Sequence, residues 1–268
     1  MTDQQRALQI FKTLRDRRVH LRELRGEKRE EEAPPSAPVD PDPGVKSLEG
    51  FYAFAWPQLL ESHSQVFQDL WVLYEMDGLK EGYFIEFGVA NGTTLSNSFN
   101  LERRHGWTGI ISEPNPTFHE NIQRARSCQF TKKAIYSTTG LNLTFSCAER
   151  PMFSRLEAPG VETTAAHEIE VADSFDVETI SLNDAMDEFD APDVVDYVSV
   201  DTEGTEQDII EAFDFGKRLV RAFTIEHNYT DMREKIFDLM SAHGYHRRFP
   251  EISRFDDCYI HESVLTGG

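Results

Sequence analysis

The sequence predicts a doubly wound α/β fold, in which helices cover both faces of a mostly parallel seven-stranded sheet that ends in an antiparallel C-terminal strand. Two observations lead to this prediction. Short apolar segments typical of strands alternate with amphipathic segments typical of helices. Glycines and polar residues follow the ends of several of these strands, where doubly wound sheets bind their ligands. The 268 residues suffice for one such domain with an N-terminal helical arm.

The composition narrows the classes of partner. The chain has 27 Lys and Arg against 47 Asp and Glu, a formal net charge of −20, which disfavours nucleic acids and anionic membranes as partners. No apolar run reaches the roughly 20 residues of a membrane span, and charges occupy the N-terminus where a signal peptide is hydrophobic. We therefore expect a cytoplasmic protein. Three separated cysteines fit neither a disulfide framework nor a zinc site.

The first 47 residues differ in composition from the rest. Residues 1–32 are predicted to form a helical arm and residues 33–47 a proline-rich, extended linker, so that the globular domain spans residues 48–268. A surface or partly disordered arm is favoured over a short dimerising coil, which would make a homodimer, because Arg17 interrupts the apolar stripe and fewer than three clean heptads are present. That stripe comprises Ala7, Ile10, Leu14, Leu21 and Leu24.

The elements of the domain follow in order along the chain. The first half predicts a partly buried helix over 64–76, a strand over 83–87, a glycine turn over 88–92 leading into a helix from 93, a strand over 109–114, a helix over 116–126 and a short strand over 131–136. The segment 51–56, rich in aromatic residues, is expected to pack in the core rather than to cover a substrate.

The second half begins with a segment that resists assignment. Residues 139–190 are taken as an insertion loop, with strand-like 141–146 and 175–180 on either side of an irregular piece. The pattern then predicts a buried strand over 194–200, a helix over 206–213, a strand over 222–225, a helix over 231–242 and two antiparallel strands over 245–249 and 258–261.

The turn after the first strand suggests which ligand binds there. Gly88, Ala90 and Gly92 do not have the glycine spacing of a dinucleotide site. Glu86, two residues before Gly88, would repel a pyrophosphate but can accept hydrogen bonds from an ammonium group. S-adenosylmethionine carries that ammonium group and no phosphate. A plain structural turn remains the alternative.

Polar residues also end the later strands. Glu113 follows the second strand, where a carboxylate can accept the hydroxyl hydrogens of a ribose; a surface glutamate is the alternative. Asp201 ends one later strand, and Glu226, His227 and Asn228 end the next. Neighbouring strand ends meet at one crevice, so these groups are expected to share a site.

Taken together, these segments resemble the FkbM-type methyltransferases. The resemblance runs from about residue 62 to 262, and its most specific block is Asp201-x-Glu203-Gly204-x-Glu206. The other matching segments are Ser64-Gln65-x-x-Gln68-Asp69, Phe84 to Gly88 with Gly92, Leu101-Glu102 with Gly106-Trp107-x-Gly109, Glu113-Pro114-Asn115-Pro116, Asp196 to Val200, Ile225 to Asn228, and Gly244-Tyr245. Val89-Ala90-Asn91 departs from the family, which usually has Ala-Asn followed by a variable residue.

The resemblance implies a class I methyltransferase fold of the Rossmann-like type, S-adenosylmethionine as cofactor, and O-methylation of a sugar or another small hydroxylated metabolite as the reaction. We expect the cofactor to contact Glu86, Gly88, Ala90, Asn91, Gly92, Glu113, Pro114 and Asn115.

An alcohol must lose its proton before it attacks a methyl group, and the sequence offers two devices for this. His227 is the predicted general base, with Asp201 and Glu226 as further catalytic residues. Alternatively, Mg²⁺ held by Asp201, Glu226 and Asn228 acidifies the hydroxyl, as their layout resembles the metal site of catechol-type O-methyltransferases. Glu206 is interpreted as a helix N-terminal acid.

Two other functions remain open at this stage. An NAD-dependent oxidoreductase would share the sheet and the ribose-binding acid, but Glu86 and the glycine spacing count against it. A non-catalytic scaffold could retain the fold and recruit a partner through the N-terminal arm. The acids at the ends of the later strands favour a catalytic function over a scaffold.

Overall fold

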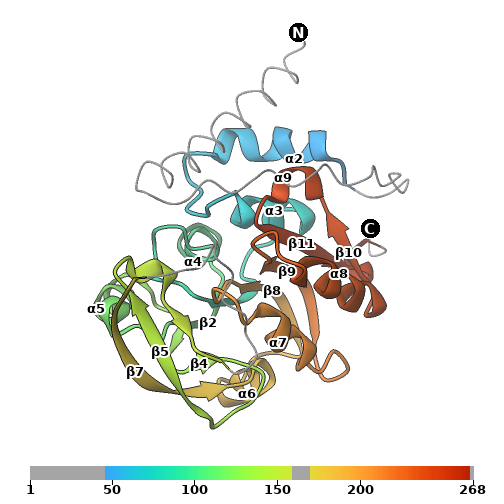
Figure 1. The fold of residues 1–268 in the computed structure, drawn as a ribbon. Coiled ribbons are helices and arrows are strands. Elements are labelled where there is room, and N and C mark those ends of the chain that lie inside the picture. The colour runs from blue at the N-terminus through green and yellow to red at the C-terminus, as the bar shows by residue number, and fades with distance from the viewer. Residues whose placement is uncertain (1–45, 159–169, 266–268) are drawn as a thin grey trace.

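The computed structural model describes residues 46–158 and 170–265 (Figure 1). The predicted helical arm over 1–32 and most of the linker over 33–47 lie outside the described residues, as does the interface of the predicted homodimer. None of the described helices combines the length and hydrophobicity that crossing a membrane requires.

The centre of the molecule is a seven-stranded sheet in the order β10-β11-β9-β8-β1-β2-β3. Its strands are β1 (Tyr83–Phe87), β2 (Thr108–Ser112), β3 (Gln129–Thr131), β8 (Val194–Val200), β9 (Leu219–Glu226), β10 (Tyr245–Arg248) and β11 (Asp256–His261). β1 pairs in parallel with both β2 and β8, and β11 is antiparallel to both of its neighbours. The predicted doubly wound, mostly parallel sheet is confirmed.

Helices cover both faces, because neighbouring residues of a strand point to opposite sides. Phe84 packs with the first layer, and Ile85 packs with the second. The first layer comprises α2 (Leu48–Ala55), the 3-10 turn η1 (Trp56–Gln58), α3 (Gln68–Glu75), α4 (Phe99–His105) and α5 (Pro116–Ala125). The second comprises α6 (Leu182–Glu188), α7 (Glu206–Glu211) and α8 (Met232–Ala242). Two short helices, α9 (Pro250–Ser253) and α10 (Glu262–Leu265), flank β11.

Two predicted helix starts are wrong, for a local reason. The helix predicted from residue 64 begins at Gln68, because Phe67 has a φ of 68° and cannot continue a helix. The helix predicted from residue 93 begins at Phe99. There, Asn91 Oδ1 accepts hydrogen bonds from the N–H groups of residues 93 and 94, and Leu95 has a φ of 64°. Both starts are preceded by left-handed residues that hydrophobic periodicity cannot reveal.

The predicted insertion contains a second, smaller sheet. Its strands β4 (Ala134–Ile135), β5 (Asn142–Ala148), β6 (Arg155–Leu156) and β7 (Val171–Ile180) lie in the order β4-β7-β5-β6, with the 3-10 turn η2 (Pro151–Phe153) between β5 and β6. The two predicted strand-like segments are confirmed, whereas the single strand predicted over 131–136 is divided between the two sheets. The small sheet has an apolar core of its own, which includes Phe145, Leu156 and Val177.

Candidate active site

One pocket lies at the carboxyl ends of β1, β2 and β8, where a doubly wound sheet binds its ligand. Gly88 and Ala90 line it after β1, Glu113 after β2, and Asp201 after β8. The small sheet completes the wall with apolar side chains, among them Phe145 and Leu156. The predicted crevice therefore exists, and the insertion forms one side of it.

The turn after β1 brings the main chain close to β8. Gly88 has a φ of 71°, and a Cβ atom there would lie 1.9 Å from the carbonyl oxygen of Asp201. Only glycine permits this approach. Gly92, with a φ of 77°, is packed against Ile122 and Arg126 of the first helix layer.

Glu113 faces the pocket and is held by the main chain. Its Oε2 accepts a hydrogen bond of 2.8 Å from the N–H of Ala90, and its Oε1 accepts one of 2.8 Å from the N–H of Asn115. Burial raises the pKa of Glu113 to about 7, and these two backbone hydrogen bonds oppose that rise. Each oxygen keeps a lone pair, so the carboxylate can accept further hydrogen bonds.

The predicted cofactor residues divide into two groups. Gly88, Ala90, Glu113 and Pro114 line the pocket, whereas Glu86, Asn91, Gly92 and Asn115 do not. Asn91 and Asn115 instead use their side-chain oxygens to accept hydrogen bonds from main-chain N–H groups two residues further on. These asparagines shape the walls of the pocket from behind.

Glu86 corrects the sequence prediction most clearly, because the structure does not support its direct contact with a cofactor. It shares a face of β1 with Phe84 and therefore points into the first helix layer. Its Oε1 accepts from the N–H of Asn97 at 2.6 Å, and its Oε2 accepts from Ser96 Oγ at 2.8 Å and from both the N–H and Oγ of Ser98. Both oxygens are thus used to hold the start of α4.

Arg126, which the sequence analysis did not single out, supports the same loop. This buried guanidinium, at the end of α5, donates to Glu102 at 2.6 Å, to Ser98 Oγ at 2.7 Å and to the carbonyl of Gly92 at 3.1 Å. Its Nη1 lies 3.9 Å from Glu86 Oε2. One cation therefore balances two buried carboxylates beneath the pocket.

Two amide side chains in the pocket wall have a polar atom without a partner. Gln65 and Asn97 are 5% and 6% exposed, and both line the pocket. Gln65 Nε2 and Asn97 Oδ1 are buried and make no hydrogen bond, while Asn97 Nδ2 donates to Ser199 Oγ at 2.9 Å. An unsatisfied buried polar atom is costly, so its presence in a pocket indicates a ligand. In the sequence, the only sign of this part of the pocket wall was the Ser64-Gln65 segment of the family resemblance.

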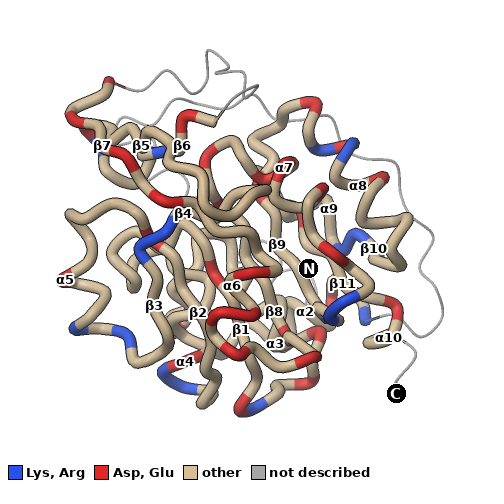
Figure 2. The backbone as a smooth tube through the Cα atoms, turned by 90° about the horizontal axis from the view of Figure 1, so that it is seen from below, with Lys and Arg blue, Asp and Glu red and all other residues tan. Residues whose placement is uncertain are grey.

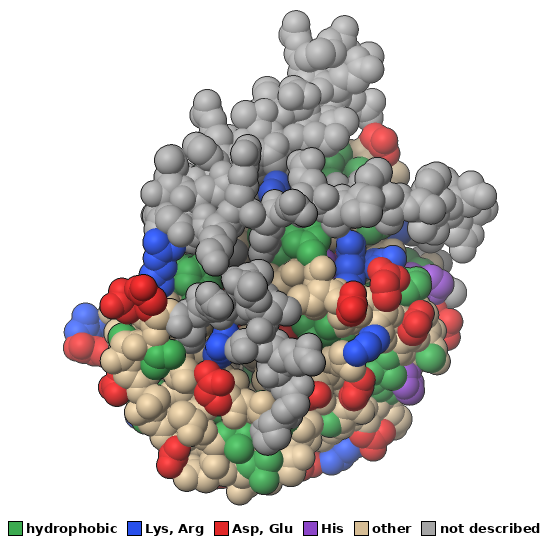
Figure 3. Space-filling model, in the orientation of Figure 1, with side chains coloured by type: hydrophobic (Ala, Val, Ile, Leu, Met, Phe, Trp, Pro, Cys, Tyr) green, Lys and Arg blue, Asp and Glu red, His purple; other side chains and the backbone are tan. Residues whose placement is uncertain are grey.

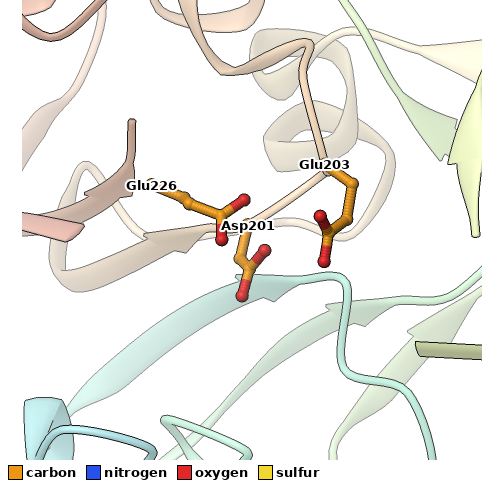
Figure 4. Close-up of side chains that lie close together, drawn as sticks. All are labelled: Asp201, Glu203 and Glu226. Carbon is orange, nitrogen blue, oxygen red and sulfur yellow. The ribbon is translucent and has the colours of Figure 1, made fainter. Parts of the chain in front are cut away.

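Acidic side chains gather at the edge of the pocket next to β8 and β9. Asp201, Glu203 and Glu226 each place one carboxylate oxygen within 4.8 Å of the others, and Figure 4 shows the three groups facing one another. Asp201 and Glu203 line the pocket, and Glu226 lies behind them, 4% exposed. Burial and then Asp201 raise the pKa of Glu226 well above its ordinary value. The prediction that Asp201 and Glu226 lie close together is confirmed.

Glu206 fixes the loop that carries these acids. Its Oε1 accepts from the N–H of Thr202 at 2.7 Å and from Thr202 Oγ1 at 2.9 Å, and its Oε2 accepts from the N–H of Gly204 at 3.0 Å. The predicted role of Glu206 at the N-terminus of α7 thus extends to holding Glu203, whose φ is 61°.

His227 is not placed to act as the predicted general base. It directly follows Glu226, the last residue of β9, and lies beside Asp257, whose carboxylate accepts hydrogen bonds from Arg233 of α8. Its Nδ1 accepts from the N–H of Tyr229 at 3.0 Å, and its Nε2 lies 3.7 Å from Asp257 Oδ1. Burial lowers the pKa of His227 to about 4, so the imidazole is neutral, and it does not line the pocket. Asn228 remains a predicted ligand.

Comparison with known proteins assigns the family. A model of the methyltransferase FkbM domain matches residues 86–247, more than half of the chain. The chain belongs to the FkbM methyltransferase family. This methyltransferase has no match among curated proteins.

Two solved structures are similar to this methyltransferase at low identity. One is a precorrin-6y C5,15-methyltransferase from Geobacter metallireducens, with a TM-score of 0.39 and 13% identity over 72% of this chain and 84% of that chain. The other is a putative RNA methyltransferase from Pyrococcus horikoshii, with a TM-score of 0.37 and 12% identity over 72% of this chain and 78% of that chain.

Proposed function

We propose that this methyltransferase uses S-adenosylmethionine to methylate a hydroxyl group of a small molecule, a sugar or another polyhydroxylated metabolite. One observation carries the proposal. The glycine turn and Glu113, which suit a nucleoside, share a single pocket with Asp201 and Glu203, which suit a hydroxylated acceptor.

The pocket offers groups for each part of S-adenosylmethionine. We assign the ribose hydroxyls to Glu113, which can accept them beside its two backbone hydrogen bonds. Asn97 Oδ1, an unpaired acceptor, suits the ammonium group, and Gln65 Nε2, an unpaired donor, suits the carboxylate. The apolar side chains of Ile135 and Phe145 suit the adenine ring. This set replaces Glu86 in the predicted role.

The chain must also prepare the acceptor. Bound S-adenosylmethionine supplies an electrophilic methyl group, and methyl transfer then needs an aligned, deprotonated hydroxyl in a pocket that excludes water. Asp201 lines the pocket, whereas His227 does not. We therefore assign Asp201 to accept the hydroxyl proton.

The charge of the molecule favours a neutral or cationic acceptor over nucleic acid. Asp and Glu are spread over the described backbone in Figure 2, and the coloured residues of the face in Figure 3 show no continuous basic area. Nucleic-acid binding depends on such an area to neutralise phosphates. A sugar hydroxyl requires none.

Calorimetric titration of the full chain with S-adenosylmethionine, its demethylated product and NAD tests the proposal. We expect the first two to bind and NAD not to bind. Glu113→Ala should weaken S-adenosylmethionine at least about tenfold, since it removes hydrogen bonds from an ionised acceptor, and Glu149→Ala, on the exposed surface, should have no effect. Binding of NAD alone would favour an oxidoreductase, and binding of none of the three a scaffold.

A further inference from the structure

We infer that Asp201, Glu203 and Glu226 form a binding site for a divalent cation that presents two adjacent oxygens of the acceptor to the methyl donor. The role of the cation in orienting an acceptor rests on the proposed function, whereas its binding does not. The three carboxylates come from the end of β8, the following loop and the end of β9, and each contributes one oxygen to a group that spans no more than 4.8 Å (Figure 4).

The orphaned oxygen of Glu226 is an independent sign of a ligand. Glu226 is 4% exposed, and its Oε2 has no hydrogen-bond partner. The side chain extends from β9 towards Asp201 and Glu203 in Figure 4. A carboxylate that is removed from water and gains neither a hydrogen-bond donor nor a cation loses its solvation free energy without compensation. A cation placed among the three groups supplies that missing partner.

The chain holds this arrangement before any ligand arrives. Glu206 fixes the loop of residues 202–204 through four hydrogen bonds, which keeps Glu203 beside Asp201. Gly88 packs against the carbonyl of Asp201 on the other side. The acids therefore sit on a rigid support, as ligands in a metal site must.

The donor set selects a hard cation. Carboxylate oxygens suit Mg²⁺, Mn²⁺ and Ca²⁺. Oxygens bound to one Mg²⁺ lie about 3.0 Å apart when adjacent and about 4.2 Å apart when opposite, so the three carboxylates, which lie within 4.8 Å of one another, must draw together when the ion binds. This set keeps Asp201 and Glu226 from the sequence prediction and adds Glu203.

The position of the site in the pocket leads to the class of substrate. Asp201 and Glu203 line the pocket and Glu226 lies behind them, so the free positions of a six-coordinate cation face the acceptor. Two neighbouring hydroxyls of a polyol fill two such positions. The cation lowers the pKa of the hydroxyl to be methylated, and the second oxygen of Asp201 takes its proton. The new bond joins the deprotonated hydroxyl oxygen of the acceptor to the methyl carbon, while the sulfur–methyl bond breaks and its electron pair stays on sulfur.

Titration of the full chain with MnCl₂, followed by the electron paramagnetic resonance signal of free Mn²⁺, tests the site. We expect one saturable site per chain. Asp201→Asn, Glu203→Gln and Glu226→Gln should each weaken Mn²⁺ binding at least about tenfold, since each removes a charged ligand. The controls Asp238→Asn and Glu149→Gln alter exposed acids elsewhere and should bind Mn²⁺ as the unaltered chain does. Circular dichroism identifies any variant that fails to fold. Glu203→Gln should disturb folding least, because Glu203 lies at the pocket surface.

The outcomes separate the two proposals. Absence of a saturable Mn²⁺ site, or equal affinity in folded Glu203→Gln and the unaltered chain, overturns the cation site. S-adenosylmethionine is titrated into the same samples without metal. Its binding in the absence of a Mn²⁺ site leaves the proposed function in place, whereas a Mn²⁺ site without binding of S-adenosylmethionine overturns the proposed function alone.

Discussion

At the scale of single residues, the two amide groups with unpaired atoms distinguish a binding role from a structural one. Gln65 Nε2 is buried in the pocket wall and donates to nothing. Replacement by leucine removes this unsatisfied donor, so Gln65→Leu should melt at the same temperature as the unaltered chain or higher. Its affinity for S-adenosylmethionine should fall about 10- to 100-fold, the value of a hydrogen bond to a charged group.

Thermal melting and calorimetry on the same preparations measure both quantities. Gln58→Leu on the turn η1 serves as the control, because Gln58 does not line the pocket. A loss of stability in Gln65→Leu together with unchanged affinity would contradict the assignment, since a merely structural glutamine behaves in that way.

Glu113 predicts a pH dependence of cofactor affinity. Burial raises the pKa of Glu113 to about 7, so below that pH the carboxyl group of the free protein is mostly protonated. The form that accepts the ribose hydroxyls is the ionised carboxylate. Affinity should therefore rise with pH, by about tenfold from about pH 6 to about pH 8, as the ionised fraction rises from about a tenth to about nine tenths. Calorimetry across this range measures the slope. In Glu113→Gln the slope should vanish, and a slope that persists would place the titrating group elsewhere.

Residue-level prediction located side chains best where position along a strand decided the outcome, although their roles remain predictions. Glu113, Asp201 and Glu226 follow or end strands; the first two line the pocket, and Glu226 lies next to Asp201. Prediction failed for Glu86 and His227, because the side of the sheet to which each points depends on the packing of the layers. Phe84 and Glu86 share the face covered by α4, and His227 lies beside Asp257, which binds Arg233 of α8.

At the scale of elements, the contact between the turn after β1 and the end of β8 determines whether the pocket forms. A Cβ atom at Gly88 would lie 1.9 Å from the carbonyl oxygen of Asp201, and the φ of 71° is unfavourable for alanine. Gly88→Ala should therefore lower the melting temperature and abolish measurable binding of S-adenosylmethionine. Gly140→Ala is the matched control, because Gly140 also has a positive φ, of 82°, but has open space around it.

The comparison of the two variants separates the cost of a left-handed backbone from the cost of a steric clash with the carbonyl oxygen of Asp201. Gly140→Ala carries only the cost of the left-handed backbone, about 1 kcal/mol, and should keep full affinity. If Gly88→Ala were no less stable than Gly140→Ala and bound the cofactor normally, the close approach of β1 and β8 would not be needed for the site. Differential scanning fluorimetry gives the first comparison and calorimetry the second.

How well an element could be predicted depended on how far apart in the sequence its interacting residues lie. β1, β8 and the helix α8 show clear apolar periodicity and were located from it. The small sheet was missed as a unit because β5 pairs with β7 across the sequence, with Asn142 opposite Glu178. α3 and α4 start late because left-handed residues precede them, and φ angles above zero at Phe67 and Leu95 leave no compositional sign.

At the scale of the whole molecule, the excess of acidic residues opposes compact folding. The net charge of −20 repels itself, and the acids of the pocket edge lie within that field. Adding NaCl shortens the screening length from about 30 Å at 0.01 M to about 8 Å at 0.15 M. The melting temperature should rise by roughly 2–8 °C over this range, as about 1–2 kcal/mol of repulsion is screened in a chain of this size.

A specific cation site adds a second contribution that salt alone does not supply. MgCl₂ at the same ionic strength as NaCl should raise the melting temperature further in the unaltered chain, because a ligand bound only by the folded state stabilises it. Asp201→Asn should keep the response to NaCl and lose this additional rise, whereas Asp238→Asn should keep both. Scanning fluorimetry at matched ionic strength measures the two responses. A melting temperature independent of NaCl would show that the acidic charges are already balanced in the folded chain, and an equal Mg²⁺ response in both variants would assign the ion to the general surface.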